Sequence, residues 1–238
     1  YQIIHELGEE NSTTGTDLQG MQANPDLNYA LGRDINASAT QGWGKTLRDY
    51  HYYPFWEEWQ KYFFVGFKSF DKTSDFEGLG HKIALFHGNL FSNYSKGTLS
   101  NLKFLSAWSE DRTANVRGML SSSMSNVKIV NLELNSTFNL QIEDANMDTA
   151  YASDVGAIAY QANNAMVYFS RSNVEIKGRS NLGGFFGVAI NSKILNCIAT
   201  GSIDGYYSGI SHLYPQNCAI GRRGLSFQNN HGYWKLYL

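Results

Sequence analysis

Aromatic side chains are concentrated in one short stretch of the chain, HYYPFWEEWQKYFF, at residues 51–64. Aromatic rings stack on apolar surfaces, including the apolar face of a sugar ring. A proline favours a short helix over residues 54–62, in which Phe55, Trp59 and Tyr62 share a face at i, i+4 and i+7 spacing. We expect that face to pack on the rest of the fold. Three aromatic residues then remain for a ligand: Tyr52, Tyr53 and Trp56.

Arginines next to aromatic residues are the second feature that suggests sugar binding. An acidic sugar such as a sialic acid carries a carboxylate, and the guanidinium fork of arginine can bind it with two hydrogen bonds. Arg112 follows Trp108 closely in AWSEDRTAN, and Arg222 and Arg223 follow YPQNCAIG. These four residues complete our set of candidate ligand-binding residues. The alternative for each arginine is a solvated surface charge.

Carboxylates that cleave polysaccharides must meet across the scissile bond as an acid and a base or nucleophile. The acidic groups of the chain lie in or beside expected loops and do not recur at one position of successive repeats, so we expect no enzyme. No metal-ligand spacing and no phosphate-binding loop occur in the sequence, so we also expect no cofactor. The acidic groups are Glu57 with Glu58, Asp71 with Asp75 and Glu77, Glu110 with Asp111, and Glu143 with Asp144.

The composition favours an all-β chain that binds neither nucleic acid nor the interior of a membrane. Charged residues make up 17%, aromatic residues 14%, and glycine is far commoner than proline, at 23 against 3. This is typical of a chain rich in strands and turns. A net charge of -2 gives no basic field for phosphates, and no apolar run approaches the roughly 18 residues that span a bilayer.

The second half of the sequence repeats a pattern of a glycine followed by alternating apolar positions. Gly156, Gly183 and Gly209 are about 27 and 26 residues apart, and a wider step of about 38 residues separates Gly118 from Gly156. A period of this size indicates stacked supersecondary units, and the alternation predicts strands with one buried face. Units of this kind form a parallel β-helix, in which Asn and Ser fit the corners. The alternative, a two-sheet sandwich, requires hairpin signals that are scarce here.

We therefore expect one domain over residues 1–238, a β-helix with loop insertions and a short capping helix. The insertions are expected at about 45–62 and at 135–154, where the sequence departs from the repeat. The capping helix is expected within GTDLQGM at residues 15–21, with Thr16 or Asp17 as its N-cap. Tyr1 and the ending YWKLYL suggest a fragment of a longer chain.

Two cysteines, Cys197 and Cys218, are too few for a disulfide framework and lack zinc-site spacing. In an exported protein a bridge between them would stabilise the fold by roughly 3 kcal/mol. The alternative is two buried free thiols.

Three segments together resemble a known family: LQGMQANPDLNYALGRDINASATQGW (18–43), FVGFKSFDKTSDFEGLGHKI (64–83) and the later GGFFG and SKILNCIATGSIDG units. They are similar to two-partner-secretion exoproteins with Gly-Leu-any-Gly repeats, and most of all to the high-molecular-weight adhesins. The resemblance implies a right-handed β-helix, secretion through an outer-membrane partner, and a place at the bacterial cell surface. It further implies adhesion to host-cell glycans, which would include sialylated ones, and sugar modification at the sequons of Asn93 and Asn135.

We expect from these features a secreted adhesin domain whose partner is a host-cell glycan or glycoprotein. The alternatives are a structural β-helix spacer of a large exoprotein and a polysaccharide-cleaving enzyme.

Overall fold

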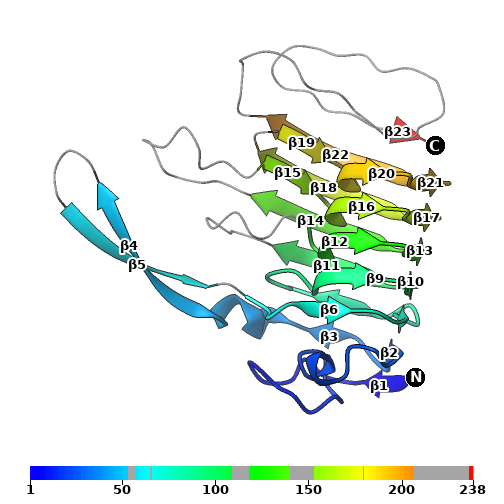
Figure 1. Cartoon of the computed structure of the whole chain (residues 1–238), viewed down its shortest axis with the longest axis horizontal. Coiled ribbons are helices and arrows are strands. Elements are labelled where there is room, and N and C mark those ends of the chain that lie inside the picture. Colours follow the sequence, from blue (N-terminus) through cyan, green and yellow to red (C-terminus); the bar gives the residue numbers. More distant parts are fainter. Residues whose placement is uncertain are drawn as a thin grey trace.

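The computed structural model of the chain describes residues 1–52, 57–64, 66–108, 118–139, 153–178, 180–205 and 236–237. In these residues the chain is nearly all strand, as the composition predicts (Figure 1). The helical segments among them are two 3₁₀ turns, η1 (Gly20–Ala23) and η2 (Ser38–Gly42).

Three larger sheets contain most of the strands. The first sheet has the order β1 (Gln2–Ile4), β2 (Tyr29–Leu31), β7 (Phe76–Glu77), β10 (Thr98–Ser100), β13 (Lys128–Val130), β17 (Met166–Tyr168) and β21 (Lys193–Leu195). The second has the order β23 (Leu236–Tyr237), β22 (Ile198–Gly205), β18 (Arg171–Gly178), β14 (Glu133–Asn139), β11 (Lys103–Trp108), β8 (Lys82–Ala84) and β3 (Ile35–Asn36). The third has the order β20 (Phe186–Ile190), β16 (Ala159–Asn163), β12 (Ser121–Ser125), β9 (Phe91–Ser95) and β6 (Phe70–Lys72).

Two smaller sheets complete the fold. One pairs β15 (Ser153–Gly156) with β19 (Ser180–Gly183) in parallel, and the other pairs β4 (Lys45–Tyr52) with β5 (Glu57–Phe64) in antiparallel. Among the described residues, antiparallel pairing is confined to β4 with β5 and β22 with β23. The described residues therefore do not form a sandwich of hairpins.

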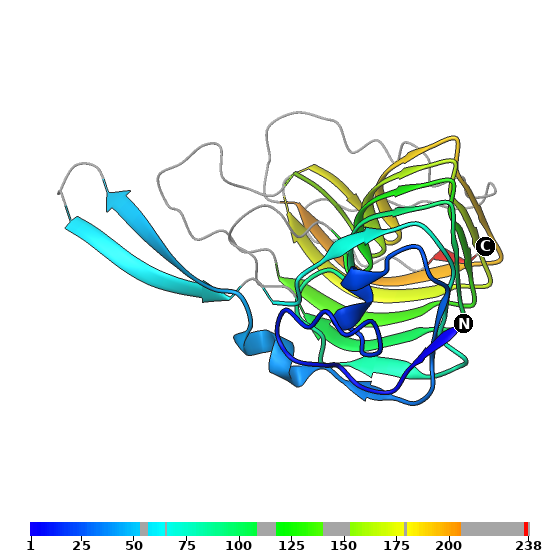
Figure 2. The same cartoon turned by 60° about the horizontal axis from the view of Figure 1, so that its bottom comes forward.

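Successive strands visit the three large sheets in a fixed order. The chain passes through β9, β10 and β11 in the third, first and second sheets, and then through β12, β13 and β14 in the same order. We call one such passage a unit. Figure 2, with the N-terminal end forward, shows the strands of successive units lying behind one another.

The spacing of the units agrees with the glycine steps in the sequence. The Asn126 and Asn164 side chains are hydrogen-bonded neighbours 38 residues apart, and Ala165 and Ser192 are bonded neighbours 27 residues apart. Earlier units are 23 and 30 residues long, and the longest, at 47, contains the β4–β5 hairpin. Unit length varies, while the strands keep their pairing.

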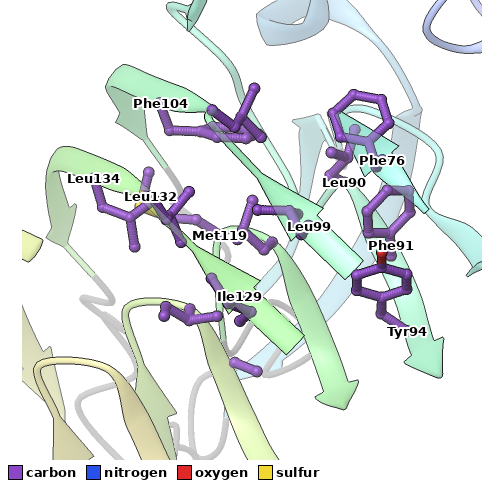
Figure 3. Close-up of a cluster of buried hydrophobic side chains, with 14 of the residues drawn as sticks. Phe76, Leu90, Phe91, Tyr94, Leu99, Phe104, Met119, Ile129, Leu132 and Leu134 are labelled. Atoms are coloured by element: carbon purple, nitrogen blue, oxygen red, sulfur yellow. The ribbon is translucent and has the colours of Figure 1, made fainter. Parts of the chain in front are cut away.

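One apolar core lies between the large sheets. In the first sheet the inward position is occupied in register by Phe76, Leu99, Ile129, Val167 and Ile194, all of them buried. Since alternate strand residues face opposite sides, this ladder fixes which face is inside. Figure 3 shows side chains from the three large sheets meeting in the core, including an edge-to-face pair of Phe76 and Phe91 at 6.1 Å.

Asparagines occupy the corners between strands, as expected. Asn101, Asn131 and Asn196 have φ angles of 51°, 54° and 54°, in the left-handed region that Asn tolerates better than most residues. The Asn131 amide group also donates to the Asn101 side-chain oxygen at 2.8 Å. The corners are thus held by side-chain bonds between units.

The glycines that begin the repeats are required by close backbone packing. A Cβ at Gly156 would lie 2.2 Å from the Ala159 carbonyl oxygen and 2.5 Å from the backbone of Phe186 in the next unit. A Cβ at Gly183, which pairs with Gly156 in register, would lie 1.9 Å from the Phe186 oxygen. No side chain larger than hydrogen fits there without backbone movement.

The helical turn expected at residues 15–21 occurs slightly later, as η1. Asp17 is buried, and its carboxylate accepts hydrogen bonds from the Gly20 N–H at 2.6 Å and from the Ser12 hydroxyl at 2.7 Å. Leu18 and Met21 are fully buried and join the core. The turn therefore covers the N-terminal end of the core with apolar side chains.

A buried lysine joins this N-terminal segment to the third sheet. The Lys72 ammonium donates to the carbonyl oxygens of Pro25 at 3.0 Å and Leu27 at 2.7 Å, and also to the Ser74 hydroxyl. It lies 5.4 Å from the centre of the Tyr29 ring. Burial lowers the pKa of Lys72 to about 8, against the opposing effect of Asp75 and Asp26.

This pKa predicts a specific pH dependence of stability. Between pH 8 and about 10.5 the unfolded chain holds the Lys72 proton more tightly than the folded chain, so the free energy of unfolding rises with pH in that window. We expect the wild type to gain about 1 to 2 kcal/mol more than Lys72→Met between pH 7 and pH 9.5. Chemical denaturation of both proteins at the two pH values measures this. Burial raises the pKa of the Cys197 thiol and adds an opposite slope, but it is common to both proteins. Equal pH dependence in both would contradict the prediction.

Candidate functional site

Several long connections of the chain leave from one corner of the fold. In each unit the chain reaches the end of a second-sheet strand and then passes toward the third sheet. The second-sheet strands of the repeated units are parallel and in register, so their carboxyl ends lie along one edge. We call this edge the loop corner. From β3 to β22 it crosses five strand spacings, roughly 24 Å.

Four connections at the loop corner are long enough to carry a binding site. Residues 45–64 follow β3 and η2, residues 109–117 follow β11, residues 140–152 follow β14, and residues 206–235 follow β22. The first of these is described as β4 and β5, which pair over eight residues from Lys45 opposite Phe64 to Tyr52 opposite Glu57. Figures 1 and 2 show this hairpin projecting away from the large sheets.

The base of the hairpin is closed by backbone and aromatic contacts. The Gly66 N–H donates to the Trp43 carbonyl oxygen at 3.1 Å, and the Trp43 ring stacks on Phe67 at 6.2 Å. Gly44 and Gly66 have positive φ angles of 66° and 85°, which let the chain turn out of the sheet and back into it. Phe67 then pairs with Gly88 of the next unit, so the chain is back in register with its neighbour directly after the hairpin.

The prediction of a helix over residues 54–62 is wrong for its described part, residues 57–62. Glu57–Phe64 is the strand β5, and an i, i+4, i+7 spacing does not define a common face in a strand. The aromatic residues of this stretch satisfy both patterns, and β-branched or aromatic residues favour strands. The strand β5 is stabilised by its pairing with β4, which the sequence pattern did not reveal.

All seven candidate ligand-binding residues belong to the loop-corner connections or to the strands that lead into them. Tyr52 is the last residue of β4, and Trp108 is the last residue of β11. Tyr53, Trp56, Arg112, Arg222 and Arg223 lie outside the described residues. The candidate residues belong to three connections, 45–64, 109–117 and 206–235. These connections are far apart in sequence, but the strands that precede them end along one edge. The insertion expected at 135–154 is shorter than expected, because residues 135–139 continue β14.

Three of the acidic candidates, Asp71, Asp75 and Glu77, have structural hydrogen bonds. Asp75 accepts the Thr98 N–H at 2.8 Å, and Glu77 accepts the Leu79 N–H at 2.8 Å. Asp71 accepts an Asn93 amide hydrogen at 2.7 Å. Glu110, Asp111, Glu143 and Asp144 lie outside the described residues.

The two sequon asparagines are exposed and lie on strands. Asn93 in β9 is bonded to Asp71, and the Asn135 side-chain oxygen in β14 accepts from Asn173 at 3.4 Å. Both side chains are accessible from solvent. Their modification stays a prediction.

Cys197 is buried beside the backbone of the core. Its thiol donates to the Leu195 carbonyl oxygen at 3.2 Å and accepts the Ser170 N–H at 3.4 Å. Cys218 lies outside the described residues, so the disulfide stays a prediction.

The part of the chain that the structure describes contains no group of three or more His, Cys, Asp or Glu side chains that could hold a metal ion. None of its helices has the length and apolar character needed to cross a membrane.

Two residues with clear roles were not found from the sequence. Lys72 is a buried polar residue, and the carbonyl groups that it contacts are 45 to 47 residues away. Phe169 is an exposed aromatic residue at a corner position, and alignment of the repeats by their glycines would have shown it among asparagines.

Comparison with known proteins found no match: neither protein-family models, nor curated proteins, nor solved structures resemble the chain detectably.

Proposed function

We propose that the chain is a glycan-binding adhesin domain that uses the loop corner as its binding site. The observation that carries this proposal is that the candidate aromatic and arginine residues all belong to segments beginning at one edge of the second sheet. Sugar binding needs aromatic faces and hydrogen-bonding groups from several segments at one place. An edge of stacked strand ends supplies such a place, and the hairpin adds a projecting wall.

We further propose that the three large sheets are the walls of a right-handed parallel β-helix with η1 as its N-terminal cap. The fixed order of sheets, the parallel register and the single core support it. A domain of this kind keeps its shape while its loops vary, which suits recognition of diverse receptors.

The resemblance to the high-molecular-weight adhesins supports the remaining parts of the proposal. These are secretion by an outer-membrane partner, display at the bacterial surface, and a host-cell glycan or glycoprotein as receptor, with sialylated glycans first. A polysaccharide-cleaving activity is less favoured, because Asp71, Asp75 and Glu77 each hold a structural hydrogen bond.

A glycan array at about 0.15 M salt tests the proposal, with each sialylated glycan printed beside its desialylated form. We expect saturable binding without turnover, and stronger binding to the sialylated member of a pair. Silence of a folded sample at high protein concentration would favour a structural spacer. Loss of the printed glycan with new reducing ends would show an enzyme.

A further inference from the structure

One outward position of the first sheet carries apolar or aromatic residues in three successive units. This position is occupied in register by Ile3, Ala30, Glu77, Ser100, Val130, Tyr168 and Leu195. Glu77 and Ser100 in the middle are polar, and the last three residues are apolar or aromatic. Leu195 is 48% exposed. Solvent contact alone would favour polar residues at every step.

The corner residue next to this ladder is Phe169, whose conformation is unfavourable for its type. Phe169 has a φ of 51° and is 61% exposed. Its N–H donates to the Leu195 oxygen, as the Asn131 N–H donates to the Tyr168 oxygen, so the two corners are equivalent. A bulky residue in the left-handed region is strained, and Asn occupies the same corner in neighbouring units. Residues held under such strain are concentrated at binding sites.

Phe169 belongs to a continuous apolar patch. The patch consists of Val130, Met166, Tyr168, Phe169 and Leu195. These residues come from β13, β17 and β21, which are adjacent strands, and Met166 is 43% exposed. Met166, Phe169 and Leu195 are exposed, Val130 and Tyr168 are half-buried, and a cluster of such residues is a candidate interaction surface.

Two lysines border the patch and indicate the charge of its ligand. Lys128 and Lys193 flank Met166 in register, one in the preceding unit and one in the next. The Lys128 ammonium lies 5.9 Å from the centre of the Tyr168 ring. Within the described ranges neither lysine has an ion-pair partner. An anionic group on a ligand that stacks on the aromatic rings would therefore meet two positive charges.

We propose that the apolar patch with Lys128 and Lys193 is a second glycan subsite, specific for a sugar that carries a carboxylate or sulfate. It rests on the proposed function, but it lies apart from the loop corner. In Figure 1 the strands β13, β17 and β21 are at the right edge of the molecule, and the hairpin projects to the left. Sugar rings stack on Phe169 and Tyr168, and the lysines select the acidic group.

The variant Phe169→Asn tests the subsite without risk to the fold, because Asn occupies the same corner in neighbouring units. We expect an unchanged or higher melting temperature and an affinity for sialyllactose or a sulfated oligosaccharide that falls at least fivefold. The neutral parent sugars should be affected less. Lys128→Gln with Lys193→Gln should remove the preference for the acidic sugar and its salt dependence.

Leu79→Asn is the matched control, since Leu79 also has a positive φ, 52°, and is 58% exposed, but belongs to an early unit. We expect it to bind as the wild type does. Wild-type affinity of Phe169→Asn, with binding lost on removal of the hairpin, would refute the subsite and keep the proposed function. A wild type that binds no glycan would refute both. An effect of Phe169→Asn only on anionic phosphatidylserine vesicles, or only on dimerisation in light scattering, would also refute the subsite.

Discussion

Removal of the β4–β5 hairpin is expected to weaken glycan binding strongly and to leave the rest of the fold intact. Residues 45–64 pair with each other in a sheet of their own, and the Gly66 N–H already bonds to the Trp43 oxygen across the hairpin base. An Asn-Gly turn can therefore join residue 44 to residue 65. We expect the melting temperature to stay within about 4 °C and binding to fall at least tenfold.

A second variant separates the hairpin backbone from its aromatic residues. It keeps the hairpin and replaces Tyr52, Tyr53 and Trp56 by serine. If those residues bind the sugar, this variant loses binding as the deletion does. If only the deletion loses binding, the contact lies elsewhere on the hairpin. Array binding by the deletion variant at the wild-type level would rule out the hairpin as part of the site.

The substitution Gly156→Ala should be strongly destabilising, although it adds only one methyl group. Its Cβ would lie 2.2 Å from the Ala159 oxygen and 2.5 Å from the Gly187 nitrogen, and both of these atoms are backbone. Neither can rotate away, so the units must separate locally. Overpacking of this kind costs about 3 kcal/mol or more, which lowers the melting temperature by about 6 to 12 °C in a chain of this size.

Gly42→Ala is the control for Gly156→Ala. Gly42 lies in η2, is exposed, and a Cβ there would meet nothing within 4 Å. Alanine also lowers the entropy of the unfolded chain, so we expect no loss and a gain of up to about 1 kcal/mol. Thermal melts of both variants decide the comparison. Equal melting temperatures would mean that the repeat glycines are not set by backbone contact.

The repeat could be predicted because its cause is local in each unit. Glycine is the one residue that fits where a Cβ atom would lie within 3 Å of the backbone of the next unit, so glycine marks the start of a unit. The steps from Gly118 to Gly156 and from Gly156 to Gly183 therefore equal the number of residues between paired positions of neighbouring strands in the third sheet. Alternating apolar residues such as Val127 and Ile129 likewise follow from one buried face.

The remaining features depend on contacts that no short pattern contains. The aromatic sequence at 54–62 fits both a helical stripe and a strand. Its described part, residues 57–62, is a strand because it pairs with β4. The loop corner arises because strands from different units end at one edge, which the sequence shows only after the register is known. Lys72 is buried because two carbonyl groups about 45 residues earlier need a donor.

Units of different length keep the same pairing between strands. The units are 23 to 47 residues long, and the connections between strands take up this difference while the strands stay paired in the sheets. Each loop-corner connection can therefore be exchanged, lengthened or removed independently of the others. A library that varies one connection at a time would change the proposed binding surface on a constant scaffold, and the closed base at Trp43 and Gly66 is the best-defined place to graft a new connection.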